Sequence, residues 1–376
     1  MFITRLEYSI LLFLQQHPLA NLSLISDNLG VSFYTVKKTY QSLLLKNLIS
    51  GVAAIISPAA LNLEKATVFF EIDNYKSIKT LEQILDSHNY TRYRTRYICG
   101  ESRGLYVNFE LPPQCATFLN EFGDLLVEKG IVKSYTLFSR NSGEYRTSVN
   151  VRFVDWETLE WRFDIHSWVN SFRSLGLESS TNDILSVDKP IFNNSTRINE
   201  LDLWVMRALS KDAKVTIKKL KEIIEIESGC IQNRCIVKDL STISRSVKRI
   251  EEKFVLEYQL LLNNKLLGLN NQIVFQIQED GLLFKKLVSH LMKHPLPFKS
   301  TLNQFSGGFH WYIRCPSEYI SELINAIWEL NPSSMKIMHL IPPSRLYYFY
   351  PLNYDLANKK WKDDYNWFFD PVLSYL

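Results

Sequence analysis

Apolar residues in the first fifty positions recur every three or four residues, which predicts three short helices. Ser32 is placed to cap the third helix, and the turn LGVS before it supplies a glycine where the chain must reverse. Three helices with a tight turn before the third predict a helix-turn-helix unit. The positions that define the three apolar faces are Leu6, Ile10, Leu11 and Leu14, then Leu22, Ile25 and Leu29, then Val36, Tyr40 and Leu43.

The same succession of helices recurs in the second half of the chain. Its third helix lies in DLSTISRSVKRIEEKFV, where Asp239 or Ser241 can cap the start. This copy differs from the first because an insert, ESGCIQNRCIVK, lengthens the link before the third helix. The matching apolar positions are Leu201, Val205, Met206 and Leu209, then Ile217, Leu220 and Ile224, then Ile243, Val247 and Ile250.

Strand-like segments follow each helix unit. The runs VAAIISPAALNL and VLEYQLLLNNKLLGL would form wings, and a βαββαβ order follows each of them. In the first half this order is ATVFFEID, SIKTLEQILDSH, TRYRTRYICG, GLYVNFELP, PQCATFLNEFGDLLVEKG and VKSYTLFSR. The order is typical of a ferredoxin-like unit and recurs from NQIVFQIQ onward.

The predicted fold is therefore α+β, with two winged helix-turn-helix domains alternating with two ferredoxin-like domains. Each ferredoxin-like unit is followed by an extension with spaced Asp and Trp residues, which we expect to clasp a neighbouring surface: Asp155, Trp161 and Asp164 match Asp355, Trp361 and Asp364. We expect winged helix domains at 1–63 and 197–268, ferredoxin-like domains at 64–140 and 269–345, and extensions at 141–196, including a polar linker, and at 346–376.

Composition narrows the class of protein without naming a function. The chain of 376 residues is 46% hydrophobic and 22% charged, which is ordinary for a soluble globular protein. A net charge of +4 permits nucleic-acid binding without requiring it. Five scattered cysteines favour a reducing compartment. No apolar stretch reaches the length of a membrane span. We interpret the N-terminal apolar run as a core helix rather than a signal peptide, and we therefore expect a cytoplasmic protein.

The ordered parts resemble the Lrp/AsnC (feast/famine) family of transcription regulators. The resemblance lies in INELDLWVMRALSKDAKVTIKKL, in ISRSVKRIEEKFVL and in LNNKLLGL leading into the sheet domain. It covers about residues 1–140 and 197–345. It implies a DNA-binding regulator whose two fused copies form an intramolecular pseudo-dimer, with further homo-oligomers allowed.

Binding to double-stranded DNA would use the outward faces of the two third helices. Lys and Arg there would neutralise phosphates, while Gln41 and Arg245 have the geometry to contact base edges. The alternative is that these are ordinary solvated helix faces, or that one copy keeps only a packing role. The candidate DNA-binding residues are Tyr34, Thr35, Lys37, Lys38, Gln41, Thr242, Ser244, Arg245, Lys248 and Arg249.

The resemblance also implies an effector site at the turns between the second and third strands of each sheet domain. Glu101 would stand in for the acidic residue that family turns carry, and the second copy has no acid, so binding of an amino-acid effector is doubtful. The glycines are equally explained as hairpin residues. The candidate effector-turn residues are Gly100, Glu101, Gly104, Gly307 and Gly308.

Signals for other chemistry are weak. Cys230 and Cys235 lack a second ligand pair, His290 and His294 lack a third ligand, and neither a GxxxxGK[ST] nor a GxSxG motif occurs. We therefore expect no metal, cofactor or catalytic residue, and a protein that is not an enzyme.

Two alternatives to a regulator stay open. Siroheme decarboxylases are built on the same frame, and in such an enzyme propionate-binding candidates here would be Arg92, Arg94, Arg96 and His310. The other alternative is a scaffold whose helix units contact the transcription machinery.

Overall fold

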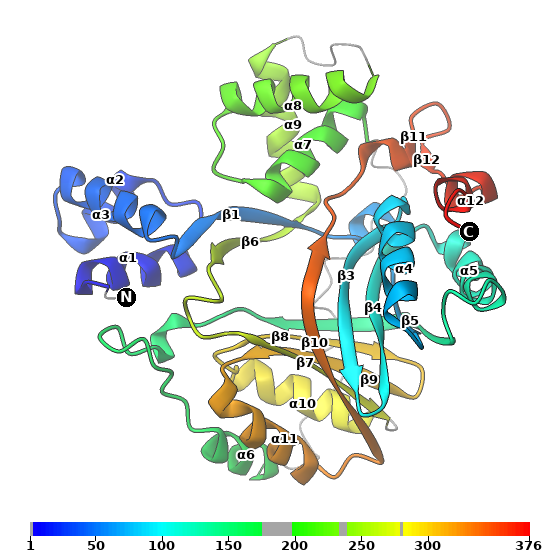
Figure 1. Cartoon of the computed structure of the whole chain (residues 1–376). Helices are drawn as coiled ribbons and strands as arrows, with labels where there is room; N and C mark the ends of the chain where they lie inside the picture. Colours follow the sequence, from blue (N-terminus) through cyan, green and yellow to red (C-terminus); the bar gives the residue numbers. More distant parts are fainter. Residues whose placement is uncertain (1–2, 175–197, 233–238, 279–280) are drawn as a thin grey trace.

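The computed structural model describes residues 3–174, 198–232, 239–278 and 281–376 and contains two helix units and one central sheet (Figure 1). The first helix unit comprises α1 (Arg5–Gln16), α2 (Leu22–Leu29) and α3 (Phe33–Leu45). The second comprises α7 (Glu200–Lys211), α8 (Ile217–Gln232) and α9 (Leu240–Lys253). Helix α8 extends into the predicted insert, and Cys235 lies outside the described residues.

A buried carboxylate ties the first helix of each unit to the third. Glu7 accepts hydrogen bonds from Ser42 Oγ and Lys46 Nζ, each at 2.7 Å. Asp202 occupies the corresponding place in the second unit. It accepts a hydrogen bond of 2.6 Å from Ser246 Oγ and forms an ion pair with Arg249. Each carboxylate also completes a capping box at its own helix N-terminus, so one side chain fixes both the helix start and the helix packing.

The strands after the helix units pair with each other across the two halves. β1 (Ile49–Ile56) runs antiparallel to β6 (Val255–Leu262), with Val52 opposite Leu260 and Ala54 opposite Tyr258. We call this two-stranded sheet the ribbon. The predicted wings are therefore one shared ribbon, and its backbone hydrogen bonds hold the two helix units together.

Both βαββαβ units are present. The first contains β2 (Glu64–Glu71), α4 (Tyr75–Ser87), β3 (Thr91–Cys99), β4 (Ser102–Leu111), α5 (Ala116–Glu128) and β5 (Ser134–Thr147). The second contains β7 (Asn271–Gln278), α10 (Leu282–Lys293), β8 (Lys299–Phe305), β9 (Gly308–Cys315), α11 (Ile320–Glu329) and β10 (Ser334–Leu346). The α+β fold with ferredoxin-like units is confirmed.

Two long strands join these units into one closed sheet. The first part of β5 pairs with β2 and its last part with β8, and β10 likewise pairs first with β7 and then with β3. Each long strand has a register shift shortly after it takes up its second partner. The resulting strand order is β10-β3-β4-β2-β5-β8-β9-β7, closed on itself, with helices outside and one face of every strand turned inward.

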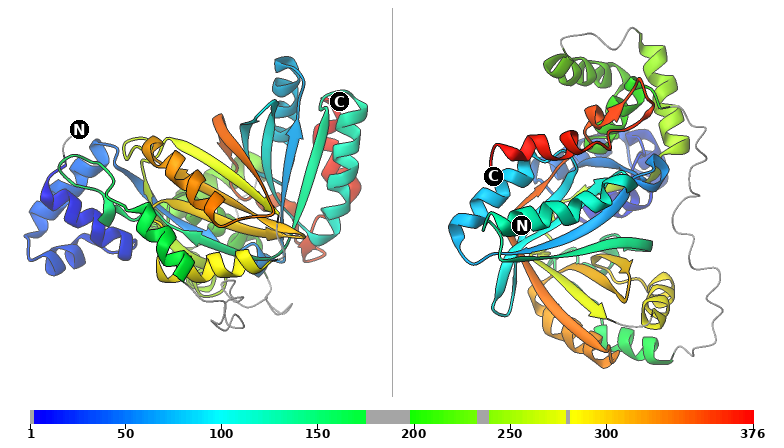
Figure 2. Two further views of the ribbon diagram at one scale, coloured as in Figure 1. Left: turned by 90° about the horizontal axis from the view of Figure 1, so that it is seen from below. Right: turned by 90° about the vertical axis from the view of Figure 1, so that its right-hand side faces the viewer.

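The two Asp/Trp extensions cross from one half of the molecule to the other, as clasps (Figure 2). Trp161 Nε1 donates to Leu267 O at 2.7 Å, and Trp361 Nε1 donates to Leu61 O at 2.6 Å. Beyond these tryptophans, α6 (Ile165–Ser174) packs on α11, and α12 (Tyr365–Leu373) packs on α4 and α5. The short strands β11 (Tyr354–Asp355) and β12 (Lys360–Trp361) belong to the second clasp. Among the described residues, no helix combines the length and apolarity that crossing a membrane requires.

Each clasp covers a buried histidine. His88 lies 4.5 Å from Phe368, and His290 lies 4.7 Å from Trp168, measured between ring centroids. Burial lowers the pKa of His88 to about 3, and burial together with the nearby His294 lowers the pKa of His290 to about 4. Both rings are therefore neutral in the folded protein at neutral pH.

We predict that acid loosens the clasps. Both folded-state pKa values lie below the ordinary histidine value of about 6.5, so the stability that these groups contribute is fully present above pH 6.5 and is lost as pH falls toward 4. At pH 5 each histidine should cost about 2 kcal/mol of unfolding free energy relative to pH 7. Urea unfolding between pH 7 and 5 measures this, and His88→Phe should flatten the slope. The exposed His166→Gln is the control, and a slope unchanged in His88→Phe would contradict the assignment.

Candidate functional site

A cavity of about 570 Å³ lies inside the closed sheet. Its walls are the inward faces of strands from both ferredoxin-like units, and its lining includes residues 53–56 of β1 and Glu257, Gln259 and Leu261 of β6. The ribbon that joins the helix units therefore also forms one wall of this cavity. Its volume lies in the range of small-molecule sites, about 300–1,000 Å³.

The charged lining of the cavity is predominantly basic. Among the described residues, five basic and three acidic side chains line it: Lys65, Arg92, Arg146, Lys299 and Arg314 against Glu110, Glu144 and Glu257. Lys65 Nζ lies 2.9 Å from Glu144, which also contacts Arg146, and Arg92 Nε lies 3.3 Å from Glu110. An excess of two positive charges in a recessed space favours an anionic ligand.

Lys299 and Arg314 have no ion pair within the described part of the chain. They lie opposite each other on β8 and β9. The Nε atom of Arg314 is buried and lacks a hydrogen-bond partner there. Burial, together with repulsion from Arg146 and Arg314, lowers the pKa of Lys299 to about 8. These two cations are the charged groups of the cavity whose bonding capacity is least used.

His310 is the one histidine among the described cavity-lining residues, and it sits in an aromatic niche. Its ring centroid lies 4.5 Å from Phe138, 4.6 Å from Phe305 and 5.4 Å from Phe69. Its exposed fraction is 2%, and its buried Nε2 has no hydrogen-bond partner among the described residues. Burial lowers its pKa to about 3, so the imidazole is neutral and can bind a metal ion or a hydrogen-bonding group.

Tyrosines supply further polar groups beside His310. The hydroxyls of Tyr93 and Tyr312 donate to Gln272 Oε1 at 3.2 and 3.1 Å. Burial raises the pKa of Tyr106 to about 12 and also raises the pKa of Tyr312. Tyr106 and Tyr312 therefore stay protonated at neutral pH, and the proton of Tyr312 is directed at Gln272.

Only part of the predicted arginine set reaches the cavity. Arg92 lines it because the register shifts between Thr91 and Tyr93. Arg94 instead pairs with Asp86 and Glu82, and Arg96 pairs with Glu82, on the helix-covered side of the sheet. Of the three arginines that a decarboxylase was expected to use, only Arg92 therefore lines the cavity, because the alternation of β3 sends Arg94 and Arg96 outward.

The candidate DNA-binding residues lie largely where the sequence places them. The predicted residues of α3, Tyr34, Thr35, Lys37, Lys38 and Gln41, are exposed, and so are Ser244, Arg245 and Lys248 of α9. Thr242 is half-buried and hydrogen-bonded to the capping residue Asp239. Arg249 is half-buried and ion-paired with Asp202, so its charge is already neutralised within the helix unit.

The candidate effector-turn glycines have backbone explanations. Gly100 and Gly307 adopt positive φ values of 57° and 82° in the two hairpins. A Cβ on Gly104 would lie 1.7 Å from Phe70 O, and one on Gly308 would lie 2.0 Å from Ile277 O. Glu101 is exposed. These residues therefore shape the strands, and the cavity lies elsewhere in the sheet.

Within the described ranges, no group of three or more His, Cys, Asp or Glu residues is arranged to hold a metal ion. The His290 ring already contacts Trp168 O through Nε2 at 3.1 Å. The side chain of Cys230 and all of Cys235 lie outside what the structure describes.

Apart from Arg92 and His310, sequence reasoning missed the most informative cavity residues. Lys299, Thr301 and Asn303 alternate along one strand, as do His310, Tyr312 and Arg314 along the next. That period of two places each set on one face. It does not show that the sheet closes, so the shared interior could not be inferred.

Comparison with known proteins adds a match over the whole chain. No protein-family model matches the sequence, and no curated protein is similar enough in sequence to count as a relative. The crystal structure of the siroheme decarboxylase NirDL matches with a TM-score of 0.52 at 12% identity, covering 98% of this chain and 99% of that one. NirDL in co-complex with an iron-uroporphyrin III analogue matches with the same TM-score and identity, over 92% of this chain and 95% of that one.

Transcription regulators match a smaller part. An AsnC family regulator from Agrobacterium tumefaciens has a TM-score of 0.33 at 13% identity and covers 40% of this chain and 99% of its own. The expectation that the protein is not an enzyme is corrected, because the structure that matches over the full length is that of an enzyme.

Proposed function

We propose that this protein binds a carboxylate-bearing iron tetrapyrrole in the central cavity and removes a peripheral carboxyl group from it as CO2. The single observation that carries the proposal is the cavity itself, whose described lining combines an excess of cations with one neutral histidine, His310, whose Nε2 has no hydrogen-bond partner among the described residues. The full-length likeness to a siroheme decarboxylase frame supports the same assignment.

The cavity fits the chemistry of such a substrate. A tetrapyrrole presents two apolar faces and a rim of carboxylates. The aromatic side chains Phe138 and Phe305 offer apolar contact, while Arg92, Lys299 and Arg314 offer cations for the rim. The neutral Nε2 of His310 is a suitable ligand for the substrate's iron or a hydrogen-bond partner for its rim.

Decarboxylation breaks one carbon–carbon bond, releases CO2 and requires a proton at the carbon that remains. Tyr106, Tyr312 and the neutral His310 are proton-carrying groups that line the cavity, and burial keeps both phenols protonated. We assign His310 to substrate binding and the phenols to proton supply.

Spectroscopic titration with iron-uroporphyrin III tests the binding part of the proposal. We expect a shifted Soret band and a stoichiometry of one per chain. His310→Ala should weaken binding by about tenfold or more, since it removes the one histidine that the described cavity offers. Tyr312→Phe should leave binding within about threefold and lower the rate of CO2 release from siroheme.

The matched control is His339→Ala, because His339 is exposed on β10 and does not line the cavity. Absence of a spectral change at micromolar protein and ligand would reject the proposed function. Equal affinities of His310→Ala and wild type would reject the role given to His310.

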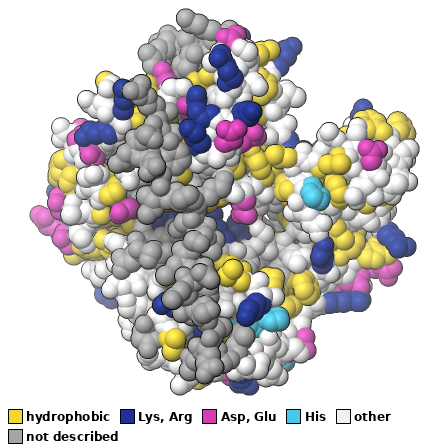
Figure 3. All heavy atoms as spheres, turned by 180° about the vertical axis from the view of Figure 1, so that it is seen from behind, with side chains coloured by type: hydrophobic (Ala, Val, Ile, Leu, Met, Phe, Trp, Pro, Cys, Tyr) yellow, Lys and Arg dark blue, Asp and Glu magenta, His cyan; other side chains and the backbone are white. Residues whose placement is uncertain are grey.

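A second candidate function, DNA binding, is favoured by α9 specifically. Arg245 and Lys248 are exposed on this helix and have no acidic partner within 4 Å among the described residues, whereas Arg249 is already ion-paired. On the face shown in Figure 3, basic and acidic side chains are intermingled. The exposed cations of α9 are therefore suited to contact phosphates, and this function is compatible with a ligand in the cavity.

Fluorescence anisotropy with pooled genomic fragments across a salt series tests DNA binding. The double variant Arg245→Ala, Lys248→Ala should bind more weakly, and its slope of log affinity against log salt should fall by about two, one for each phosphate that the variant no longer neutralises. A double variant at the exposed Lys129 and Lys293 removes the same charge from helices that cover the sheet, and should retain the wild-type slope. Identical slopes in both double variants would exclude α9 as the DNA-binding helix.

A further inference from the structure

Lys299 and Arg314 form an unusual pair inside the closed sheet. They are directly opposite residues on the adjacent strands β8 and β9. Like charges in opposite positions repel each other and destabilise a sheet unless an anion lies between them. Neither side chain has an ion pair among the described residues, although the cavity also contains acidic groups.

The bonding capacity of this pair is unfilled. Arg314 Nε is buried and has no partner, so a guanidinium built for two parallel hydrogen bonds offers at least one donor that nothing in the described chain accepts. A carboxylate matches a guanidinium in a two-point contact and would bring negative charge to Lys299 at the same time. One carboxylate would therefore accept the unused hydrogen bond of Arg314 and neutralise the charge of Lys299.

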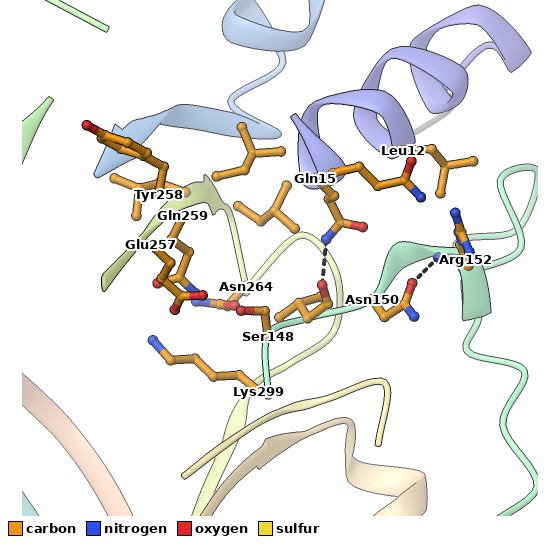
Figure 4. A pocket seen from close by; sticks show the side chains of 15 residues that line it. Leu12, Gln15, Ser148, Asn150, Arg152, Glu257, Tyr258, Gln259, Asn264 and Lys299 are labelled. Carbon is orange, nitrogen blue, oxygen red and sulfur yellow. Dashed lines mark hydrogen bonds between the residues drawn. The ribbon is translucent and has the colours of Figure 1, made fainter. Parts of the chain in front are cut away.

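The pair lies where two cavities adjoin. A second cavity of about 380 Å³ lies between α1, β6 and the segment after β5, and Lys299, Glu257 and Gln259 line both cavities. Figure 4 shows Lys299 and Glu257 pointing toward each other at the edge of the second cavity. Gln15 closes the α1 side of that cavity, donating to Val149 O at 2.5 Å.

We propose that Arg314 and Lys299 are the anchoring subsite of the central cavity and bind one peripheral carboxylate of the ligand at the junction with the second cavity. This assignment rests on the proposed function for the identity of the ligand. It adds which residues orient that ligand: the carboxylate bound here directs the macrocycle away from β6 and toward His310.

Binding at this subsite is coupled to a proton. The charged groups facing Lys299 are Arg146 from β5, Arg314 from β9 and Glu257 from β6. The two arginines favour the neutral amine and Glu257 favours the charged one. A bound carboxylate raises the pKa of Lys299 above its free value of about 8, so affinity is constant below that pH and falls as pH rises above it.

Binding of metal-free uroporphyrin III, followed by fluorescence, tests the subsite separately from iron ligation by His310. Lys299→Met and Arg314→Met should each weaken binding by about tenfold or more, as expected for removal of a hydrogen-bonded charge. The double variant should lose less than the product of the two single effects, because both residues bind one carboxylate. Lys336→Met, an exposed strand lysine outside the cavity lining, is the matched control.

A pH series gives a signature that a merely structural role would not produce. Wild-type affinity should fall between about pH 8 and 10. Lys299→Arg should bind as tightly as wild type at pH 7 and keep that affinity to about pH 10, since its charge does not titrate there. Circular dichroism checks that each variant is folded. Binding by folded Lys299→Met and Arg314→Met equal to wild type would overturn the subsite while leaving the proposed function intact.

A second measurement tests the carboxylate subsite even if the proposed tetrapyrrole function is wrong. If the wild-type protein binds no porphyrin, amine-selective acylation of Lys299 is measured by mass spectrometry with and without mellitate, a rigid polycarboxylate. Protection of Lys299 that is absent in Arg314→Met supports the carboxylate subsite without the tetrapyrrole. Equal acylation with and without mellitate overturns it.

Discussion

The sharing of two long strands between the halves is the constraint on which the rest of this structure depends. β5 and β10 each complete one ferredoxin-like unit and then continue as an edge of the other, so neither unit has a free sheet edge where they meet. Closure turns one face of every strand into an interior. It also places the ribbon over the cavity, because β1 and β6 lead into β2 and β7, the first strands of the two halves. The clasps then secure the exterior, each packing on the half that it does not directly follow.

An enclosed interior changes what its charged residues can do. On an open sheet Lys65, Arg146 and Lys299 would be solvated and would favour no particular ligand. Within the closed sheet they lie close to one another, and Glu144 compensates two of the three. The positive charge of Lys299, which Glu144 does not neutralise, is repelled by the neighbouring arginines, and a bound anion would reduce that repulsion. The same enclosure keeps His310 neutral and keeps Tyr106 and Tyr312 protonated. Closure of the sheet therefore accounts both for the grouping of charges and for the protonation states in the cavity.

The elements of the fold could be predicted from sequence because they depend on local periodicity. Val36 and Leu43 mark the buried face of one helix, and Ile243 and Ile250 mark that of another, each within a single segment. The same order of strands and helices occurs in both halves, so the prediction for one half supports the prediction for the other. What could not be predicted depends on pairing between distant segments. Nothing local indicates that β1 pairs with β6, or that β5 and β10 change partners. The arginines of β3 show the limit: one register shift decides that Arg92 lines the cavity while Arg94 binds Asp86, and such a shift has no sequence signature.

Duplication followed by divergence explains why the cavity has two unlike ends. Gly104 on β4 and Gly308 on β9 occupy the same register against β2 and β7, so residues at equal distances from them correspond. Tyr106, Asn108 and Glu110 in the first half therefore match His310, Tyr312 and Arg314 in the second. One end carries a phenol and an acid where the other carries an imidazole and a guanidinium. A ligand with carboxylates all round its rim would bind a symmetric cavity in several orientations, whereas this one distinguishes them by charge. The frame keeps its internal symmetry in the backbone, and the side chains that line the cavity break it.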